Sequence, residues 1–276
     1  MWKMKSKQYH LSGDNQLTMP LACVSVLLLL AACQAQPLSE PHTGEEQLLE
    51  DEDTVDISTR ILSSNNQSDT FLLEGDLRNA MKCWYNSCLW PKSSDGLVYI
   101  PYIVNSEFNS YETRVISSAL SSFHGPTCIR FVPRQTQNDY ISVENQSGCF
   151  SALGRQGGRQ VLSLNRGGCV YAGIVEHEFN HALGFQHEQT RSDRDQYVRI
   201  NWANMDPTMA YNFYKSDTNN LNTPYDYGSI MHYGRTAFSN NGRETITPLS
   251  SSPVDIGQRQ ALSSWDIKRI NMLYSC

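Results

Sequence analysis

The sequence predicts an α+β protein with two lobes. Strand-like and helix-like segments alternate from residue 97 to a histidine-rich stretch that ends near residue 188. The chain is then irregular and polar as far as Tyr225, and a regular pattern returns only at residues 263–274. Mixed elements of this kind pack as helices on a sheet. We therefore expect an N-terminal lobe with a sheet and helices above a cleft, and an irregular second lobe that ends in a helix.

The individual elements follow from hydrophobic spacing and from stop signals. Residues 110–123 place apolar side chains at helical intervals, and Gly125-Pro126 ends that pattern. Near the C-terminus, Ser263 and Asp266 form a capping-box pattern ahead of an apolar stripe, which predicts the last helix. The strand-like segments before the histidines are 97–104, 129–132 and 140–143.

The histidine-rich stretch has the spacing of a metal site. His177 and His181 are four residues apart, so a helix would place both imidazoles on one face. Gly184 can adopt positive φ and end the helix, and the reversed chain can then bring His187 to the same point. Three neutral imidazoles suit Zn²⁺ and leave a position for water, as catalytic zinc sites do. Glu178 lies where it can take a proton from that water. A helix that carries histidines by chance would not explain the glycine and the third histidine.

The extended motif resembles a known family. The string HEFNHALGFQHEQTRSDRD at 177–195 is similar to the signature of the astacins, a branch of the metzincin endopeptidases. The string SIMHY at 229–233 resembles their Met-turn. The resemblance covers residues 79–276, and CWYNSCLWPK at 83–92 points to the six-cysteine fish group that includes the hatching (choriolytic) enzymes. It implies a two-lobe metzincin domain with a twisted, mostly parallel sheet, and one Zn²⁺ per chain.

The resemblance also implies roles for residues of the Met-turn. Tyr233 would be a fifth zinc ligand in the resting enzyme that swings away to stabilise the oxyanion of the reaction. The alternative for Tyr233 is a tyrosine packed in the core. Met231 would lie beneath the metal as a packing residue, and His232 has no metal role.

Other implied roles lie farther from the metal. Glu188 would meet the mature N-terminus, the alternative being a surface carboxylate near Arg191 and Arg194. Arg259 lies in the segment that shapes the pocket just after the scissile bond, and would favour an acidic residue there. The glycine-rich segment 149–169 contains a strand-like stretch, which is either an ordinary edge strand or the strand that borders the cleft and pairs with substrate; both can hold.

The first 35 residues have the pattern of a secretory signal peptide. Lys3, Lys5 and Lys7 precede a short apolar run at 21–32, which is shorter than the roughly 20 residues that cross a membrane. We expect cleavage after Ala35, with Met19 as an alternative start. The string LAAC at 30–33 also resembles a bacterial lipoprotein box, which the six later cysteines disfavour. The expected location is extracellular, with storage in secretory granules as an option.

Residues 36–78 form an acidic segment with 11 acidic and 2 basic side chains, a net charge of −9. Such a segment cannot bury a core by itself, so it is either a solvated linker or a propeptide. The string LEGD at 73–76 resembles the Phe-x-Gly-Asp motif of astacin propeptides, with Leu in place of Phe. The resemblance implies that Asp76 occupies the water position on zinc. An activating protease that cleaves after Arg78 would make Asn79 the new N-terminus.

Residues 79–276 carry 17 Lys and Arg against 16 Asp and Glu, so nothing suggests a nucleic-acid partner. The six cysteines of this part allow 15 pairings and imply an oxidising compartment. The cysteines could instead bind zinc, but no two of them are separated by two residues, which is the usual spacing in such sites. The resemblance implies the pairs Cys83–Cys88, Cys128–Cys276 and Cys149–Cys169. Asn66 and Asn145 begin N-glycosylation sequons.

Together these patterns predict a secreted, monomeric zinc endopeptidase made as a zymogen, with an egg envelope among its candidate substrates. Its partners would be an activating protease and extracellular protein or peptide substrates, with neither nucleic acid nor membrane. One alternative is a six-cysteine astacin of adult tissue with other substrates. Another is a catalytically inactive binding module, which would be expected to lack Glu178 or a metal ligand.

Overall fold

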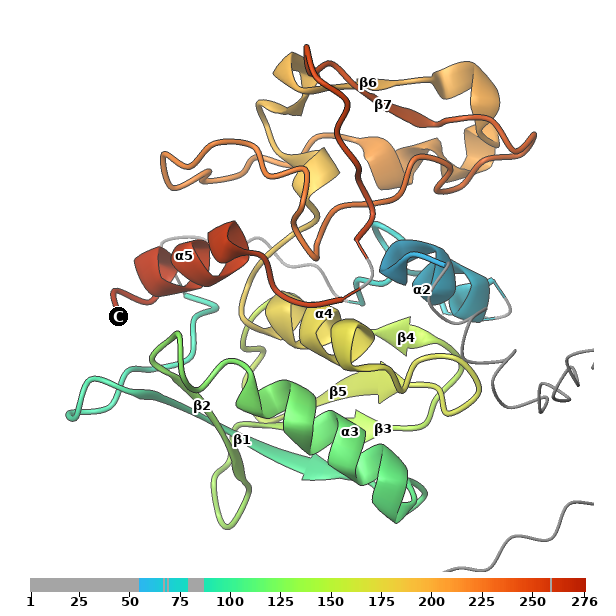
Figure 1. Ribbon diagram of the computed structural model, residues 1–276. Coiled ribbons are helices and arrows are strands. Elements are labelled where there is room, and N and C mark those ends of the chain that lie inside the picture. Colours follow the sequence, from blue (N-terminus) through green and yellow to red (C-terminus); the bar gives the residue numbers. More distant parts are fainter. Residues whose placement is uncertain (1–54, 67, 69, 79–86, 259) are drawn as a thin grey trace, which may run out of the picture. The chain divides into compact units, whose positions relative to one another are not determined.

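The computed structural model describes residues 55–66, 68, 70–78, 87–258 and 260–276. Within these ranges, no helix is both long enough and apolar enough to cross a bilayer. The described residues form one lobe with the main sheet and its helices, and a second lobe with a small sheet of its own (Figure 1).

The main sheet has five strands in the order β2-β1-β3-β5-β4. Three of its pairings, β1 with β2, β1 with β3 and β3 with β5, are parallel, and β4 pairs with β5 antiparallel. The prediction of a mostly parallel sheet is therefore confirmed. The strands are β1 (Val98–Val104), β2 (Ile129–Pro133), β3 (Tyr140–Glu144), β4 (Cys149–Phe150) and β5 (Arg159–Leu164).

Two helices, α3 (Ser110–Ser121) and α4 (Ala172–Ala182), pack against each other and against the sheet (Figure 1). A capping box starts α3: the Asn109 side chain accepts from the Glu112 amide, and the Glu112 carboxylate accepts from the Asn109 amide. Every residue of α4 from Gly173 to Ala182 is buried. Since α4 carries the first two histidines, the core itself fixes their position.

The edge of the sheet differs from the prediction. Residues 160–165 were expected to form an edge or cleft-border strand, but β5, which covers most of them, lies between β3 and β4. The edge is the two-residue β4, whose neighbour Ser151 forms a parallel bridge with Leu77 of the acidic segment. The Cys149–Cys169 disulfide attaches this short strand to the end of the turn that precedes α4. A strand of two residues has no periodicity that a sequence pattern could reveal.

The second lobe is more regular than predicted. A two-stranded antiparallel sheet joins β6 (Val198–Ile200) to β7 (Ile246–Pro248). The predicted C-terminal helix is α5 (Ser264–Leu273), and it has the expected capping box between Ser263 and Asp266. Short 3₁₀ helices make up much of the remainder: η2 (Glu188–Thr190), η3 (Arg194–Gln196), η4 (Trp202–Asn204) and η5 (Pro207–Phe213).

The acidic segment contains a helix, α2 (Ile57–Asn65), which lies beside α4 (Figure 1). Asp56 caps its first turn by accepting from the Thr59 amide. Ile57 and Ile61 are buried in the same apolar cluster as the main sheet and α4. The alternative of a solvated linker is therefore wrong for the described part of this segment.

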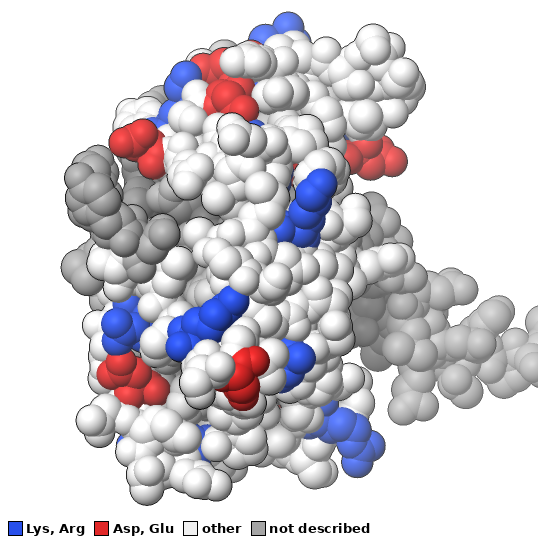
Figure 2. Space-filling model, turned by 90° about the vertical axis from the view of Figure 1, so that its left-hand side faces the viewer, with Lys and Arg blue, Asp and Glu red and all other residues white. Residues whose placement is uncertain are grey.

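Two of the disulfides that the resemblance implies are present, Cys128–Cys276 and Cys149–Cys169. Cys88 is also disulfide-bonded, whereas Cys83 lies outside the described residues. On the face that Figure 2 shows, Lys and Arg are interspersed with Asp and Glu on a mostly uncharged surface. That face offers no patch of a single charge sign.

Candidate metal centre and active site

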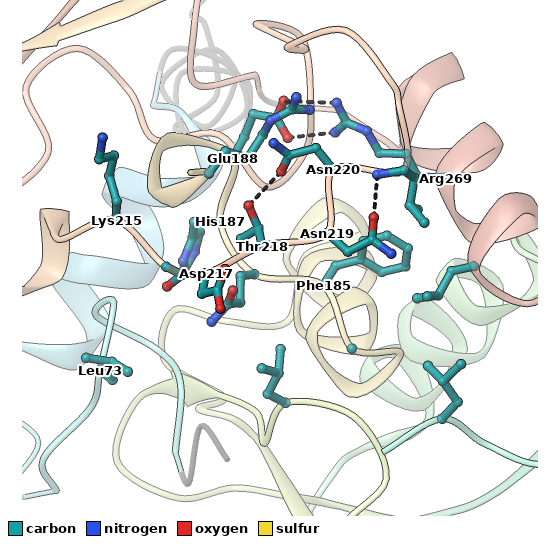
Figure 3. A pocket seen from close by; sticks show the side chains of 18 residues that line it. Leu73, Phe185, His187, Glu188, Lys215, Asp217, Thr218, Asn219, Asn220 and Arg269 are labelled. Carbon is teal, nitrogen blue, oxygen red and sulfur yellow. Dashed lines mark hydrogen bonds and ion pairs between the residues drawn. The ribbon is translucent and has the colours of Figure 1, made fainter. Parts of the chain in front are cut away.

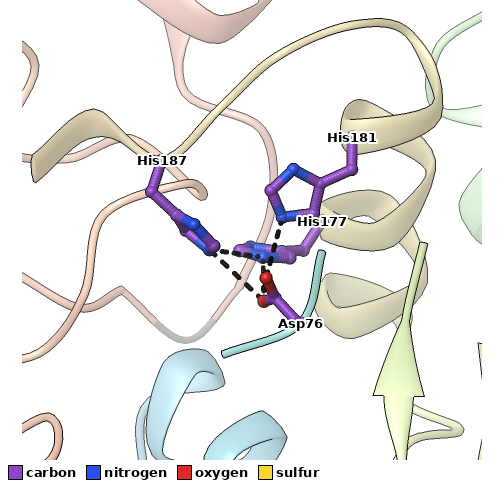
Figure 4. Close-up of side chains that lie close together, drawn as sticks. All are labelled: Asp76, His177, His181 and His187. Carbon is purple, nitrogen blue, oxygen red and sulfur yellow. Dashed lines mark hydrogen bonds and ion pairs between the residues drawn. The ribbon is translucent and has the colours of Figure 1, made fainter. Parts of the chain in front are cut away.

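Three histidine side chains converge on one point (Figure 4). His177 and His181 come from one face of α4, and the distance between their ring centroids is 4.8 Å. Gly184 has φ of +105°, which reverses the chain after the helix. His187 then precedes η2, with its ring centroid 4.7 Å from that of His181. All three residues are at most 1% exposed.

Each imidazole uses Nδ1 for an oxygen acceptor, so that Nε2 faces the common point. His177 Nδ1 lies 2.8 Å from the Ile230 carbonyl oxygen, and His181 Nδ1 lies 2.7 Å from the Phe185 carbonyl oxygen. His187 Nδ1 lies 2.9 Å from Oε2 of Glu74. Metal-binding histidines are generally held in this way, because an acceptor on one ring nitrogen fixes the tautomer that presents the other nitrogen to the ion.

Asp76 of the acidic segment supplies the fourth group at this point (Figure 4). Its carboxylate oxygens lie 3.1 Å from Nε2 of His177 and 3.3 Å from Nε2 of both His181 and His187. The four candidate ligand atoms are all within 4.8 Å of one another. Asp76 Oδ1 and His181 Nε2 are buried and lack a hydrogen bond to any described residue. Three imidazole nitrogens and one carboxylate oxygen fit a tetrahedral zinc ion.

The charges around the histidines also favour a cation. Burial lowers the pKa of His181 to about 4, which favours the neutral imidazole that a metal ligand must be. Burial acts in the same direction on His187, but the carboxylates of Asp76 and Glu74 outweigh it and raise the pKa of His187 to about 9. Two buried carboxylates thus favour positive charge near His187: Asp76 lies at the point where the Nε2 atoms meet, and Glu74 lies at Nδ1 of His187.

Glu178 is fully buried next to the first histidine. Neither of its carboxylate oxygens has a hydrogen-bond partner among the described residues. Burial raises the pKa of this carboxyl well above its usual value, and the negative charge of Asp76 adds to the effect. A buried carboxylate without a partner is costly and is typical of a group that acts on a bound molecule.

The Met-turn lies directly against the histidines. The Tyr233 ring centroid is 4.6 Å from that of His187, and its buried hydroxyl donates to the Glu74 carbonyl oxygen. Met231 is also buried, and its carbonyl oxygen accepts from the Glu188 amide at 3.0 Å. His232 points elsewhere, since its Nε2 lies 2.7 Å from the Tyr225 hydroxyl.

Glu188 does not lie at the surface, so that alternative is wrong. Its side chain is 5% exposed and forms ion pairs with Arg269 at 2.6 Å and with Arg191 at 3.3 Å. Arg194 instead pairs with Asp195. Figure 3 shows Glu188 and Arg269 facing each other at a cavity of about 520 Å³. Because the Glu188 carboxylate is buried, it requires a charge of opposite sign close by, and the two arginines supply it.

Several predicted residues fall outside the site or outside the described residues. Asn79, Cys83 and Arg259 belong to the part of the chain that the structure does not describe. Asn66 is exposed at the end of α2. Asn145 is half-buried, and its side-chain amide donates to Glu107 at 2.9 Å.

Two site residues were not found by sequence reasoning. Glu74 bonds to His187 across 113 positions of sequence, and Arg269 bonds to Glu188 across 81. Glu74 stands at the unspecified position of the Phe-x-Gly-Asp pattern, and Arg269 sits on a helix where a lone arginine is unremarkable. The LEGD string next to Asp76 was the one local signal that could have drawn attention to Glu74.

Comparison with known proteins identifies the family. The model of the peptidase family described as Astacin matches residues 82–275. The chain belongs to the astacin family. It is therefore a metalloendopeptidase of the astacin type, from a family that is zinc-dependent, and it acts on protein substrates.

Among individual members of the family, the chain is similar to choriolytic enzymes. It is 58% identical to high choriolytic enzyme 1 of Oryzias latipes over 93% of this chain and 98% of the relative. The low choriolytic enzyme of the same fish is 48% identical over 92% of this chain and 98% of the relative. A solved structure of high choriolytic enzyme 1, titled a hatching enzyme zinc-protease, superposes with a TM-score of 0.69. It has 63% identity and covers 72% of this chain and 100% of the solved one. The predicted astacin fold is confirmed.

Proposed function

We propose that this astacin is a secreted zinc endopeptidase, made as a zymogen, whose substrates are proteins of an egg envelope. The observation that carries the zymogen part is Asp76, which lies 3.1–3.3 Å from the Nε2 atoms of all three histidines. The substrate part is supported by the relatives, since two of them are named choriolytic enzymes and one structure is titled a hatching enzyme.

The chemistry would be divided between the ion and the side chains around it. Zn²⁺, when bound by His177, His181 and His187, would supply a Lewis acid that polarises a carbonyl and acidifies water. Glu178 would take a proton from the attacking water and return it to the leaving amine. Tyr233 would donate to the oxyanion once its hydroxyl is free of the Glu74 carbonyl oxygen.

Latency would follow from the same contacts. While Asp76 occupies the point where the Nε2 atoms meet, water and substrate have no access to it. The bridge between Leu77 and Ser151 fills the edge of the sheet at the same time. Cleavage after Arg78 by an activating protease would allow this segment to leave, and Asn79 would become the N-terminus of a monomeric enzyme.

The test is hydrolysis of casein by the purified proprotein before and after trypsin treatment, with and without a zinc chelator. We expect hydrolysis only after trypsin, from a product that begins at Asn79, and loss of hydrolysis with chelator. Hydrolysis by the untreated proprotein would contradict the latency role of Asp76. A zinc-loaded, correctly cut product without hydrolysis would favour the binding-module alternative.

The proposed substrate requires its own measurement. Isolated fish egg envelopes should swell or dissolve with the activated enzyme, at a rate per unit of casein activity well above that of an unrelated zinc endopeptidase. An equal rate would favour the alternative of an adult-tissue astacin with other substrates. Sedimentation of the activated enzyme tests the monomeric state, and recovery from the medium of expressing animal cells tests secretion.

A further inference from the structure

Glu74, two residues before Asp76, makes several contacts of its own with the active site. Its side chain is 3% exposed, and its backbone has a left-handed φ of +51°. Oε2 accepts from both the backbone amide and the Nδ1 of His187, at 3.2 and 2.9 Å. Oε1 accepts from the Ser216 hydroxyl at 3.3 Å, and the Glu74 carbonyl oxygen accepts from Tyr233.

These contacts make His187 different from the other two histidines. The Nδ1 acceptors of His177 and His181 are the carbonyl oxygens of Ile230 and Phe185, which belong to the catalytic domain. Among the described residues, the acceptor for His187 comes from the acidic segment. The two former acceptors stay when that segment is removed, and the acceptor of His187 leaves with it.

The charge of Glu74 matters as well as its hydrogen bonds. Among the described residues its ion-pair partner is His187, and Lys215, which lines the nearby cavity, pairs with Asp195 instead. A buried carboxylate requires a compensating positive charge. Glu74 and Asp76 together bring two negative charges, which equal the charge of a Zn²⁺ ion bound by three neutral imidazoles.

We propose that Glu74 is a second carboxylate of the zymogen latch: it holds His187 with Nε2 toward the metal position and strengthens zinc binding until the acidic segment leaves. The proposal rests on the proposed function, because it assumes a zinc zymogen. It adds that activation removes part of the zinc affinity together with the block.

The test is zinc affinity rather than activity. Zinc-loaded proproteins with the wild-type sequence, Glu74→Gln, Glu74→Ala and Asp76→Asn are titrated with a chromogenic chelator. Changing a group that orients a metal ligand typically weakens metal binding by about 10–100-fold. We expect a loss in that range for Glu74→Ala, which removes both acceptor and charge. A smaller loss is expected for Glu74→Gln, which keeps an acceptor.

The activated enzyme provides the matched control. Cleavage after Arg78 and removal of the released segment by gel filtration leave the same sequence, 79–276, from all four proproteins. Their zinc affinities should then be equal, and the wild-type proprotein should hold zinc more tightly than its own product. Differences that persist in these identical products would reveal a folding defect and overturn the assignment.

Two further results of the zinc titration would overturn the proposal. If Glu74→Gln and Glu74→Ala proproteins retain zinc as tightly as the wild type, Glu74 has no role toward the metal and the proposal fails. The proposed function would be untouched by that result, because zinc is still bound. If no proprotein binds zinc, the proposed function fails as well.

Discussion

Glu178 and the three histidines show how single residues define this site. The histidines each have an acceptor for one ring nitrogen, whereas Glu178 has no partner for either oxygen among the described residues. Its carboxylate is therefore not needed to support the fold. Under the proposed function, this side chain would act on a molecule that enters after the acidic segment leaves.

Replacement of Glu178 tests this distinction. We expect Glu178→Gln to keep the shape and the zinc content of the enzyme, because the amide is nearly isosteric and Glu178 accepts no described hydrogen bond. The turnover number of the trypsin-activated enzyme on casein should fall by at least about 100-fold, since general acid–base groups contribute about 10²–10⁴-fold. Atomic absorption measures the zinc. Full turnover with bound zinc would exclude Glu178 as the base.

Gly75 gives a second test at the residue scale. Its φ is +79°, and a Cβ there would lie 2.5 Å from Leu62 Cδ2 and 3.0 Å from the Tyr233 hydroxyl oxygen. Gly75→Ala should therefore push the chain and its neighbour Asp76 away from the histidines. We expect the untreated proprotein to hydrolyse casein at a measurable fraction of the rate after trypsin.

Gly96→Ala is the matched control for that substitution. Gly96 has a similar φ of +83°, but a Cβ there would meet nothing within 4 Å. Gly96→Ala should therefore cause a similar backbone strain, while the untreated proprotein stays latent. If both variants stay fully latent, a Cβ at position 75 does not displace Asp76 and this prediction is wrong.

Helix α2 is an element whose stability comes from another part of the chain. The acidic segment has too few apolar residues to bury a core alone. Its Ile57 and Ile61 nevertheless lie in the cluster formed by the main sheet and α4. A Cβ at Gly173 of α4 would lie 2.6 Å from Ile57 Cδ1, so this glycine provides the space for the helix.

Under the proposed function, a substitution in α2 should thus affect the proprotein and not the activated enzyme. Ile61 is 1% exposed, and truncation of a buried isoleucine typically costs about 2–5 kcal/mol. We expect Ile61→Ala to lower the melting temperature of the proprotein and to leave that of the activated enzyme unchanged. Ser63→Ala, at an exposed position of the same helix, is the control. Equal melting curves for Ile61→Ala and wild-type proproteins would show that α2 contributes no stability.

The helices and strands that could be predicted from the sequence are those long enough to show a hydrophobic pattern. Helix α3 and strands β1 to β3 were predicted to within one or two residues. Helix α2 was missed because its apolar face is narrow and its partners are distant in sequence. Strand β4 was missed because two residues carry no period, and the edge was consequently assigned to residues 160–165.

At the scale of the whole molecule, the predictable part of the site is the local part. His177, His181, Gly184 and His187 lie within one helix and one turn, so their spacing is enough to predict that they converge. The contacts of Glu74 with His187 and of Arg269 with Glu188 depend on how distant segments pack. No spacing rule specifies such pairs, and the structure was needed to find them.

The two described disulfides restrain the molecule to different degrees, because they close loops of different length. Cys128–Cys276 spans 148 positions and attaches the end of the chain, just after α5, to the start of β2. Cys149–Cys169 spans 20 positions. In the chain-entropy account, a longer loop loses more freedom in the unfolded state, which gives about 5 kcal/mol for the first bond and about 3 kcal/mol for the second.

The prediction compares the two bonds within one protein. Replacing both Cys128 and Cys276 by serine should lower the free energy of unfolding in urea more than replacing both Cys149 and Cys169. Replacing the first pair of cysteines should also loosen α5. Arg269 of this helix forms an ion pair with Glu188, and the adjoining Tyr274 donates to the Leu183 carbonyl oxygen at the end of α4. Zinc retention should therefore fall with it. A larger loss of stability from the shorter loop would mean that native packing at β4, rather than loop length, determines what each bond contributes.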